Sequence, residues 1–147
     1  LVNAVLDKHS DLISVRRRQM VDALAKKAAP TLRELVEAYV LPVALHVDST
    51  ENGLAFLLIS CQITTSGSFA GLGLERVARY PEVQQLSRLI GKAMTATNRA
   101  QRDSKILLIQ TMVFHGLAAF YVSGAAKRSA PFVETLCSSV EAVLGAR

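Results

Sequence analysis

The feature that most constrains this chain is the apolar run Ile106–Val122, which only Gln110, Thr111, His115 and Gly116 interrupt. When its residues are placed at steps of 100° around a helix, every side of that helix is mostly apolar. Such a helix is surrounded by protein, or it lies in lipid. Polar side chains near the centre of a span are costly in hydrocarbon without partners, so the sequence favours protein and we expect no membrane association.

The rest of the chain also spaces its apolar residues at intervals of three and four, which is typical of helices, and alternation typical of strands is rare. We predict a short first helix that ends near His9 and Ser10, and a second over 11–28. Thr31 and Glu34 form a capping-box signature for a third helix, which Pro42 is expected to kink or end. Asp48 and Glu51 indicate another helix start, and further helices are predicted over 53–65, 81–98, 102–123 and 130–144, with loops at 66–80 and 124–129. The predicted fold class is all-α, an antiparallel helical bundle.

The totals are those of one domain over 1–147, with 50% hydrophobic residues and a formal net charge of +5. The two cysteines, Cys61 and Cys137, are far apart and predict no disulfide framework, which indicates a reducing, cytoplasmic compartment. The basic residues are spread along the chain and there is no Trp, so we expect no direct nucleic-acid surface within it. The opening residues lack the pattern of a signal peptide and have the spacing of a helix interior, so we expect a further segment to precede them.

Motifs for catalysis are weak. His9, His46 and His115 have no second ligand three or four residues away, and neither cysteine has a histidine near it in the sequence. The stretch GLGLER at Gly71 follows no predicted strand, so a flexible connection explains it better than a phosphate loop. We therefore predict that the chain is not an enzyme and has no metal site and no cofactor.

The helix over 102–123 needs protein on every side, and one subunit of this size covers only part of it. A second subunit then covers the rest, so we predict a homodimer with a four-helix interface about a two-fold axis, in which Gly116, Ala118 and Ala119 permit close approach. The last helix is amphipathic and supplies the neighbouring apolar patch. The expected interface residues are Val113, Leu117, Phe120, Phe132, Leu136, Val140 and Val143.

Gln110 and His115 need partners if they are buried. They bond to a backbone carbonyl or to each other across the dimer axis, or one of them is a polar anchor in an apolar ligand cavity. The methionines suit either core packing or an adaptable pocket. From polarity and helix membership, the candidate ligand-binding residues are Tyr39, Phe56, Met94, Gln110, Met112 and His115.

The region 1–45 contains a first helix with the letters AVL, an arginine-bearing second helix and the proline-started helix PTLRELVEAYVLP. This order resembles the C-terminal regulatory domain of TetR-family transcriptional regulators. The stretches RDSKILLIQTMVFHGLAAFYVSG and SAPFVETLCSSVEAVLG are similar to the penultimate and last helices of that domain.

The resemblance implies dimerisation through the last two helices and a small, mostly apolar effector bound among the regulatory helices. It also implies that operator DNA is read by an N-terminal helix-turn-helix, which this chain lacks, and that residues 1–9 are the stump of the linking helix. The expected function is the effector-sensing and dimerisation domain of a TetR-like repressor. The alternative is a helical protein–protein interaction module without a small-molecule ligand.

Overall fold

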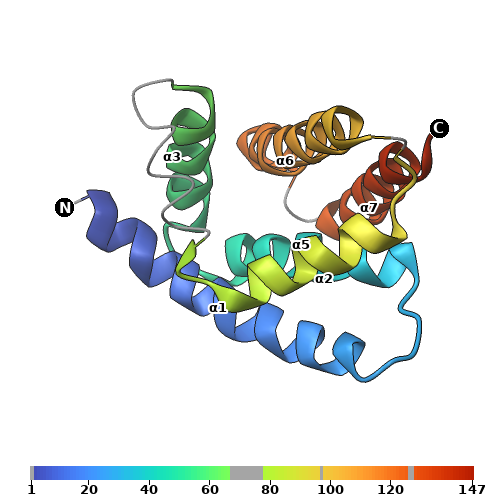
Figure 1. Cartoon of the computed structure of the whole chain (residues 1–147). Helices are drawn as coiled ribbons and strands as arrows, with labels where there is room; N and C mark the ends of the chain where they lie inside the picture. The colour runs from blue at the N-terminus through green and yellow to red at the C-terminus, as the bar shows by residue number, and fades with distance from the viewer. Residues whose placement is uncertain (1, 67–77, 97, 126–127) are drawn as a thin grey trace.

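The computed structural model describes residues 2–66, 78–96, 98–125 and 128–147, and Figure 1 shows that helices dominate them. No strand occurs within these ranges, so the all-helical class predicted from the sequence is confirmed. Most of the predicted loop at 66–80, including GLGLER, lies outside the described residues. The helices are α1 (Val2–Ala25), α2 (Leu32–Ser49), α3 (Gly53–Thr65), α5 (Pro81–Ala93), α6 (Arg99–Val122) and α7 (Ser129–Gly145).

α1 is one continuous helix, so the predicted break near His9 and Ser10 is wrong. Its buried stripe runs from Leu6 through His9 and Ile13 to Val21, without an interruption at the polar residues. The His9 side chain is only 6% exposed and packs against α2 and α3, so a residue that suggested a helix end is part of the buried face.

α2 begins at the predicted capping box. The Thr31 hydroxyl accepts a hydrogen bond from the Glu34 amide at 3.2 Å, and the Glu34 carboxylate accepts one from the Thr31 amide at 2.9 Å. The helix continues beyond Pro42 to Ser49, so Pro42 does not end it. Apolar residues on both sides of Pro42 are buried, and their packing offsets the hydrogen bond that proline removes.

The turn between α2 and α3 is tight. Asp48 and Glu51 do not start α3, because Asp48 belongs to α2 and Asn52 precedes α3 in a left-handed conformation with φ of 63°. Asparagine tolerates this conformation better than most residues. A Cβ atom on Gly53 would lie 2.9 Å from the Cα of Val47, so only glycine allows the two helices to approach this closely.

Replacing Gly53 by alanine should therefore destabilise the fold by about 1–3 kcal/mol, because the new methyl group meets backbone that cannot move aside. Gly91→Ala is the matched control inside α5, where a Cβ atom meets only the end of the Arg102 side chain at 3.9 Å. The control should raise stability by about 0.5–1 kcal/mol, because alanine favours a helix over glycine. Urea unfolding measures both, and equal effects would contradict the packing at Gly53.

α2 lies at the centre of the packing, because α1, α3, α5 and α7 all contact it. Leu35, Val36 and Val40 of α2 have no exposed surface. α6 packs against α3 and α7, and in Figure 1 it lies at the top of the molecule while α1 runs along the bottom. α6 is thus covered by its neighbours on one side only.

α5 ends at Ala93, earlier than the predicted end at Asn98. Asn98 instead caps α6, because its side chain accepts a hydrogen bond from the Gln101 amide at 2.9 Å. α6 therefore begins at Arg99, three residues before the predicted start at residue 102.

Lys105 near the start of α6 is 8% exposed and holds the end of α7 in place. Its ammonium group donates to the backbone carbonyl oxygens of Thr95, Leu144 and Ala146. The Thr95 amide also donates to the Leu144 carbonyl at 3.0 Å. These bonds satisfy carbonyl groups at a helix end that the helix itself leaves without partners.

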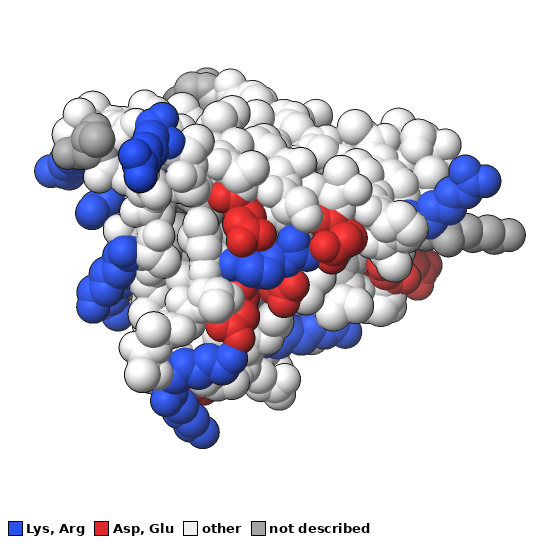
Figure 2. Space-filling view, turned by 90° about the vertical axis from the view of Figure 1, so that its right-hand side faces the viewer, with Lys and Arg blue, Asp and Glu red and all other residues white. Residues whose placement is uncertain are grey.

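Arg33 fixes α7 against α2 on the outside of the molecule. Its guanidinium contacts Glu37 of α2 at 2.8 Å and Glu134 of α7 at 2.6 Å, donates to Ser138 at 3.0 Å, and lies 3.7 Å from Glu141. Figure 2 shows acidic side chains gathered around a basic one on this side of the molecule. Single surface ion pairs contribute little, but a shared arginine with several partners sets the register of two helices.

Candidate functional site

One side of α6 is apolar and exposed. Leu107, Leu108 and Val122 are 65%, 48% and 62% exposed, whereas Val113 and Leu117 on the opposite side have no exposed surface. No charged residue occurs in α6 after Lys105. The subunit therefore covers one side of this helix and leaves an uncharged, apolar side in contact with solvent.

α7 extends this surface, because it packs beside α6 at Gly116. A Cβ atom at this glycine would lie 3.7 Å from Cδ1 of Leu136 and 3.9 Å from the Phe132 ring. Phe132 also stacks on Phe120 of α6, with ring centroids 4.3 Å apart. We call the combined surface the α6–α7 face, and it consists of Leu107, Leu108, Thr111, Met112, His115, Gly116, Ala119, Val122, Phe132, Thr135 and Ser139.

A shallow groove of about 480 Å³ lies in the α6–α7 face and opens to solvent. Its wall is mostly apolar, and it is lined by Thr111, Met112, His115, Gly116, Phe132, Thr135, Leu136 and Ser139. The Nε2 atom of His115 is buried there and has no hydrogen-bond partner among the described residues. In Figure 2 a broad area without charged side chains lies above a basic side chain that acidic ones surround.

The structure does not bring the six candidate ligand residues into one described hollow. Met112 and His115 line the groove together, and Gln110 is half-buried on another side of α6. The other three lie elsewhere. Tyr39 faces the Arg17 guanidinium at 5.7 Å, Phe56 packs against two histidines, and Met94 is buried at the end of α5.

The residues expected at the interface differ in how deeply the structure buries them. Val113, Leu117 and Val140 are buried in the core of the subunit itself, and Leu136 is buried beneath the groove that it lines. Phe120, Phe132 and Val143 are half-buried at the edge of this core. On a helical wheel, residues three or four positions apart form rows along α6, and the sequence makes every row mostly apolar without showing which row faces inward. In the structure the most exposed row contains Leu108, Met112, His115, Ala119 and Val122.

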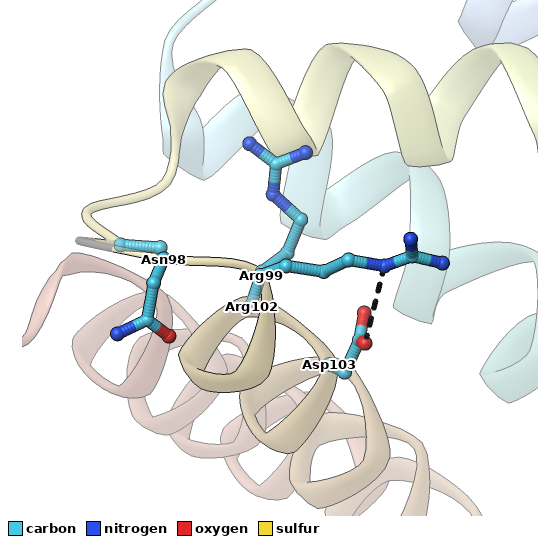
Figure 3. Close-up of a pocket in the computed structure, with 5 residues that line it drawn as sticks. Asn98, Arg99, Arg102 and Asp103 are labelled. Atoms are coloured by element: carbon cyan, nitrogen blue, oxygen red, sulfur yellow. Dashed lines mark ion pairs between the residues drawn. The ribbon is translucent and has the colours of Figure 1, made fainter.

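A second hollow, of about 530 Å³, lies at the start of α6 and was not predicted (Figure 3). Arg99 and Asp103 form an ion pair at 3.8 Å across one turn of the helix. Arg102 extends along α5, and Asn98 lies at the other end of the hollow. These side chains are exposed, and their charges are satisfied locally or by solvent, so we assign no function to this hollow.

A buried polar cluster joins α1, α2 and α3. Nδ1 of His9 and Nε2 of His46 are hydrogen-bonded at 2.7 Å, and the Phe56 ring stacks on His9 with centroids 5.1 Å apart. Nδ1 of His46 lies 3.2 Å from the Thr50 hydroxyl. His9 was expected at a helix end, although Leu6 and Ile13, at helical spacing on either side of it, were a signal of a buried face.

Farther along α1, polar side chains bind neighbouring helices. Arg17 donates to the carbonyl oxygens of Ala38 and Tyr39 at 3.4 and 3.0 Å. The Ser14 hydroxyl donates to Glu82 of α5, whose carboxylate is buried. These bonds pair the Arg17 and Ser14 donors inside the packing. The second carboxylate oxygen of Glu82 is buried and has no hydrogen-bond partner among the described residues.

The structure contains no group of three or more His, Cys, Asp or Glu side chains arranged for a metal ion within the described ranges. Cys61 and Cys137 are free and buried, and burial raises the pKa of both thiols. Both thiols are therefore neutral near pH 7 and poor nucleophiles.

No family model, no curated protein and no solved structure matches this chain. By length and composition α6 is apolar enough to cross a membrane, and 33% of its most apolar window is buried in the subunit. Core helices of soluble proteins pass the same test.

Replacing His115 by leucine should leave the free energy of unfolding unchanged or raise it by about 1 kcal/mol, because the substitution removes a buried nitrogen without a partner. His9→Leu is the contrasting variant. It leaves Nε2 of His46 without its partner and should lower the free energy of unfolding by about 1–3 kcal/mol. Urea unfolding at pH 7.5 compares them, and a larger loss at His115 would contradict this assignment.

Proposed function

We propose that this chain is the effector-sensing and dimerisation domain of a TetR-like transcriptional regulator that acts as a repressor, and that it dimerises through the α6–α7 face. The observation that carries the proposal is the side of α6 on which Leu107, Leu108 and Val122 are exposed without a charged neighbour. Of the helices on which the resemblance rests, the one that follows Pro30 and the last two long helices support it, whereas the two helices expected before Pro30 are one helix, α1.

A continuous exposed apolar surface of this kind is typical of an interaction site, because its contact with water is unfavourable. Two helices from each subunit meet in a four-helix arrangement about a two-fold axis. Thr111 and Ala119 are small enough to let the two copies of α6 approach closely. Leu108 and Met112, on the same side of α6, supply the apolar contacts.

The electrostatics favour a second copy of this chain as the partner. The chain carries a net charge of +5, and two copies repel each other where charged surfaces meet. The α6–α7 face has no charge of its own, so it can meet an identical surface without burying like charges. A two-fold axis brings identical surfaces together.

Light scattering on a size-exclusion column should therefore give about twice the chain mass of 15.9 kDa at micromolar concentration. Leu108→Glu should shift the protein to the monomer, because a carboxylate buried opposite its own copy is strongly unfavourable. Leu12→Glu on α1 is the matched control, since Leu12 is also 48% exposed, and it should remain dimeric. A monomeric parent chain, or a dimeric Leu108→Glu variant, would contradict the interface.

The effector part of the proposal rests on the groove beside Met112 and His115. A volume of about 480 Å³ is in the range of small-molecule sites, which combine apolar walls with few polar groups. The free Nε2 of His115 suits a hydrogen bond to such a ligand. Because the groove lies in the α6–α7 face, a ligand bound there would alter how the two subunits pack.

Thermal-shift screening with apolar metabolites and antibiotics should give compounds that raise Tm for the parent chain, since binding to the folded state stabilises it. Met112→Trp should abolish these shifts by filling the groove. Val15→Trp on the exposed side of α1 is the control and should keep them. Shifts that persist in Met112→Trp place the effector elsewhere, with Tyr39, Phe56, Met94 and Gln110 as the remaining candidates.

The second candidate function is a helical protein–protein interaction module without a small-molecule ligand. The observation that favours it is the shape of the two hollows described above, because both are open to solvent and neither would surround a small molecule on all sides. On this alternative the α6–α7 face binds a different protein. A monomeric parent chain that responds to no compound would support it over the regulator.

A further inference from the structure

The contact between His9 and His46 joins the first half of α1 to the rest of the molecule and plays no part in the function proposed above. The two rings are 6% and 1% exposed and meet nearly at right angles, with centroids 5.0 Å apart. Phe56 of α3 packs against both of them. Titratable rings thus lie at the junction of three helices, where water has little access.

The hydrogen bond between the two rings depends on their protonation. Nδ1 of His9 and Nε2 of His46 are 2.7 Å apart, so one nitrogen carries a hydrogen and the other accepts it. One added proton leaves this arrangement possible, because a doubly protonated ring still donates to a neutral one. A second proton places two N–H donors against each other and two positive charges beside an aromatic wall, and the contact is lost.

The charges near the pair also oppose protonation. Lys8 and Arg16 of α1 are positive, and the carboxylates of Asp7 and Asp11 on the same helix contact Arg79 and Tyr80. α3 carries no charged residue, and its thiol, Cys61, is buried. Asp48 of α2 is the nearest acidic residue along that helix, and its carboxylate accepts a hydrogen bond from Tyr121 of α6 instead of from a histidine. The described contacts place no carboxylate on either ring.

We propose that the His9–His46 contact is a pH-sensitive connection, which holds the first half of α1 against α2 and α3 above about pH 6.5 and releases it in mildly acidic solution. Release is limited to the first half of α1. The second half is held by Arg17 on the carbonyl oxygens of Ala38 and Tyr39, and an arginine stays protonated throughout this pH range.

The direction follows from the pKa values of the two rings. Burial, and then Lys8, lower the pKa of His9 below 6.5; burial, and then His9 and Arg16, lower that of His46. A group whose pKa is lowered in the closed form stabilises that form above its ordinary pKa, and this stabilisation is lost as the pH falls. The closed form is the one in which the first half of α1 packs against α2 and α3. At pH 5.5, one unit below the ordinary pKa, each proton that binds only after release raises the equilibrium constant for release by about tenfold.

Hydrogen exchange of the whole chain at pH 7.5 and pH 5.5, corrected for the intrinsic pH dependence of exchange, tests the proposal. Amides between Leu6 and Ile13 should open about tenfold more often at pH 5.5, whereas those between Arg17 and Leu24 should not change. Equal protection of Leu6–Ile13 at both values would overturn the proposal.

The double variant His9→Gln, His46→Gln keeps a hydrogen-bonding pair that does not titrate, and its exchange at Leu6–Ile13 should not depend on pH. His115→Gln removes the third histidine and should keep the response of the parent chain. If the double variant does not fold, histidine ¹⁵N spectra of the parent chain decide. Coupled titration of two rings supports the proposal, and independent titration near pH 6.5 overturns it.

Discussion

The packing of four helices around α2 is the constraint on which the rest of this structure depends. Its Leu35, Val36 and Val40 lie inside the protein, and α1, α3, α5 and α7 occupy the surrounding positions. α6 packs mainly on α3 and α7 and touches α2 through Tyr121, whose hydroxyl donates to Asp48. This long helix, apolar from Ile106 onward, is therefore a peripheral one, which is why it exposes a surface suited to a partner.

Helix positions followed from sequence where local signals decide them. The capping box at Thr31 and the proline at the start of α5 both mark real starts, because caps and fixed φ angles act within one turn. The break expected near His9 did not occur, and of the kink or end expected at Pro42 the end did not occur. At both places burial against other helices outweighs a local preference, and burial depends on residues distant in the sequence.

In the candidate site, too, local patterns were predictable from the sequence and contacts between distant residues were not. Periodicity identified a helix that is apolar on all sides, but a helical wheel has no information on the direction of the core. Val113 and Leu117 therefore entered the expected interface although they face inward, and Leu107 did not enter it although it is the most exposed leucine of α6. The pairing of His9 with His46 joins positions 37 residues apart, and no local pattern predicts it.

Lys105 gives the α6–α7 pair a property that neither helix has alone. The chain connects the end of α6 to the start of α7, and Lys105 connects the start of α6 to the end of α7 through Leu144 and Ala146. α6 and α7 are thus an antiparallel pair attached to each other at both ends, which limits how far either end of one helix can move away from the other. A molecule bound on the α6–α7 face therefore contacts two helices that are attached to each other at both ends, and these pack on α3 and α2.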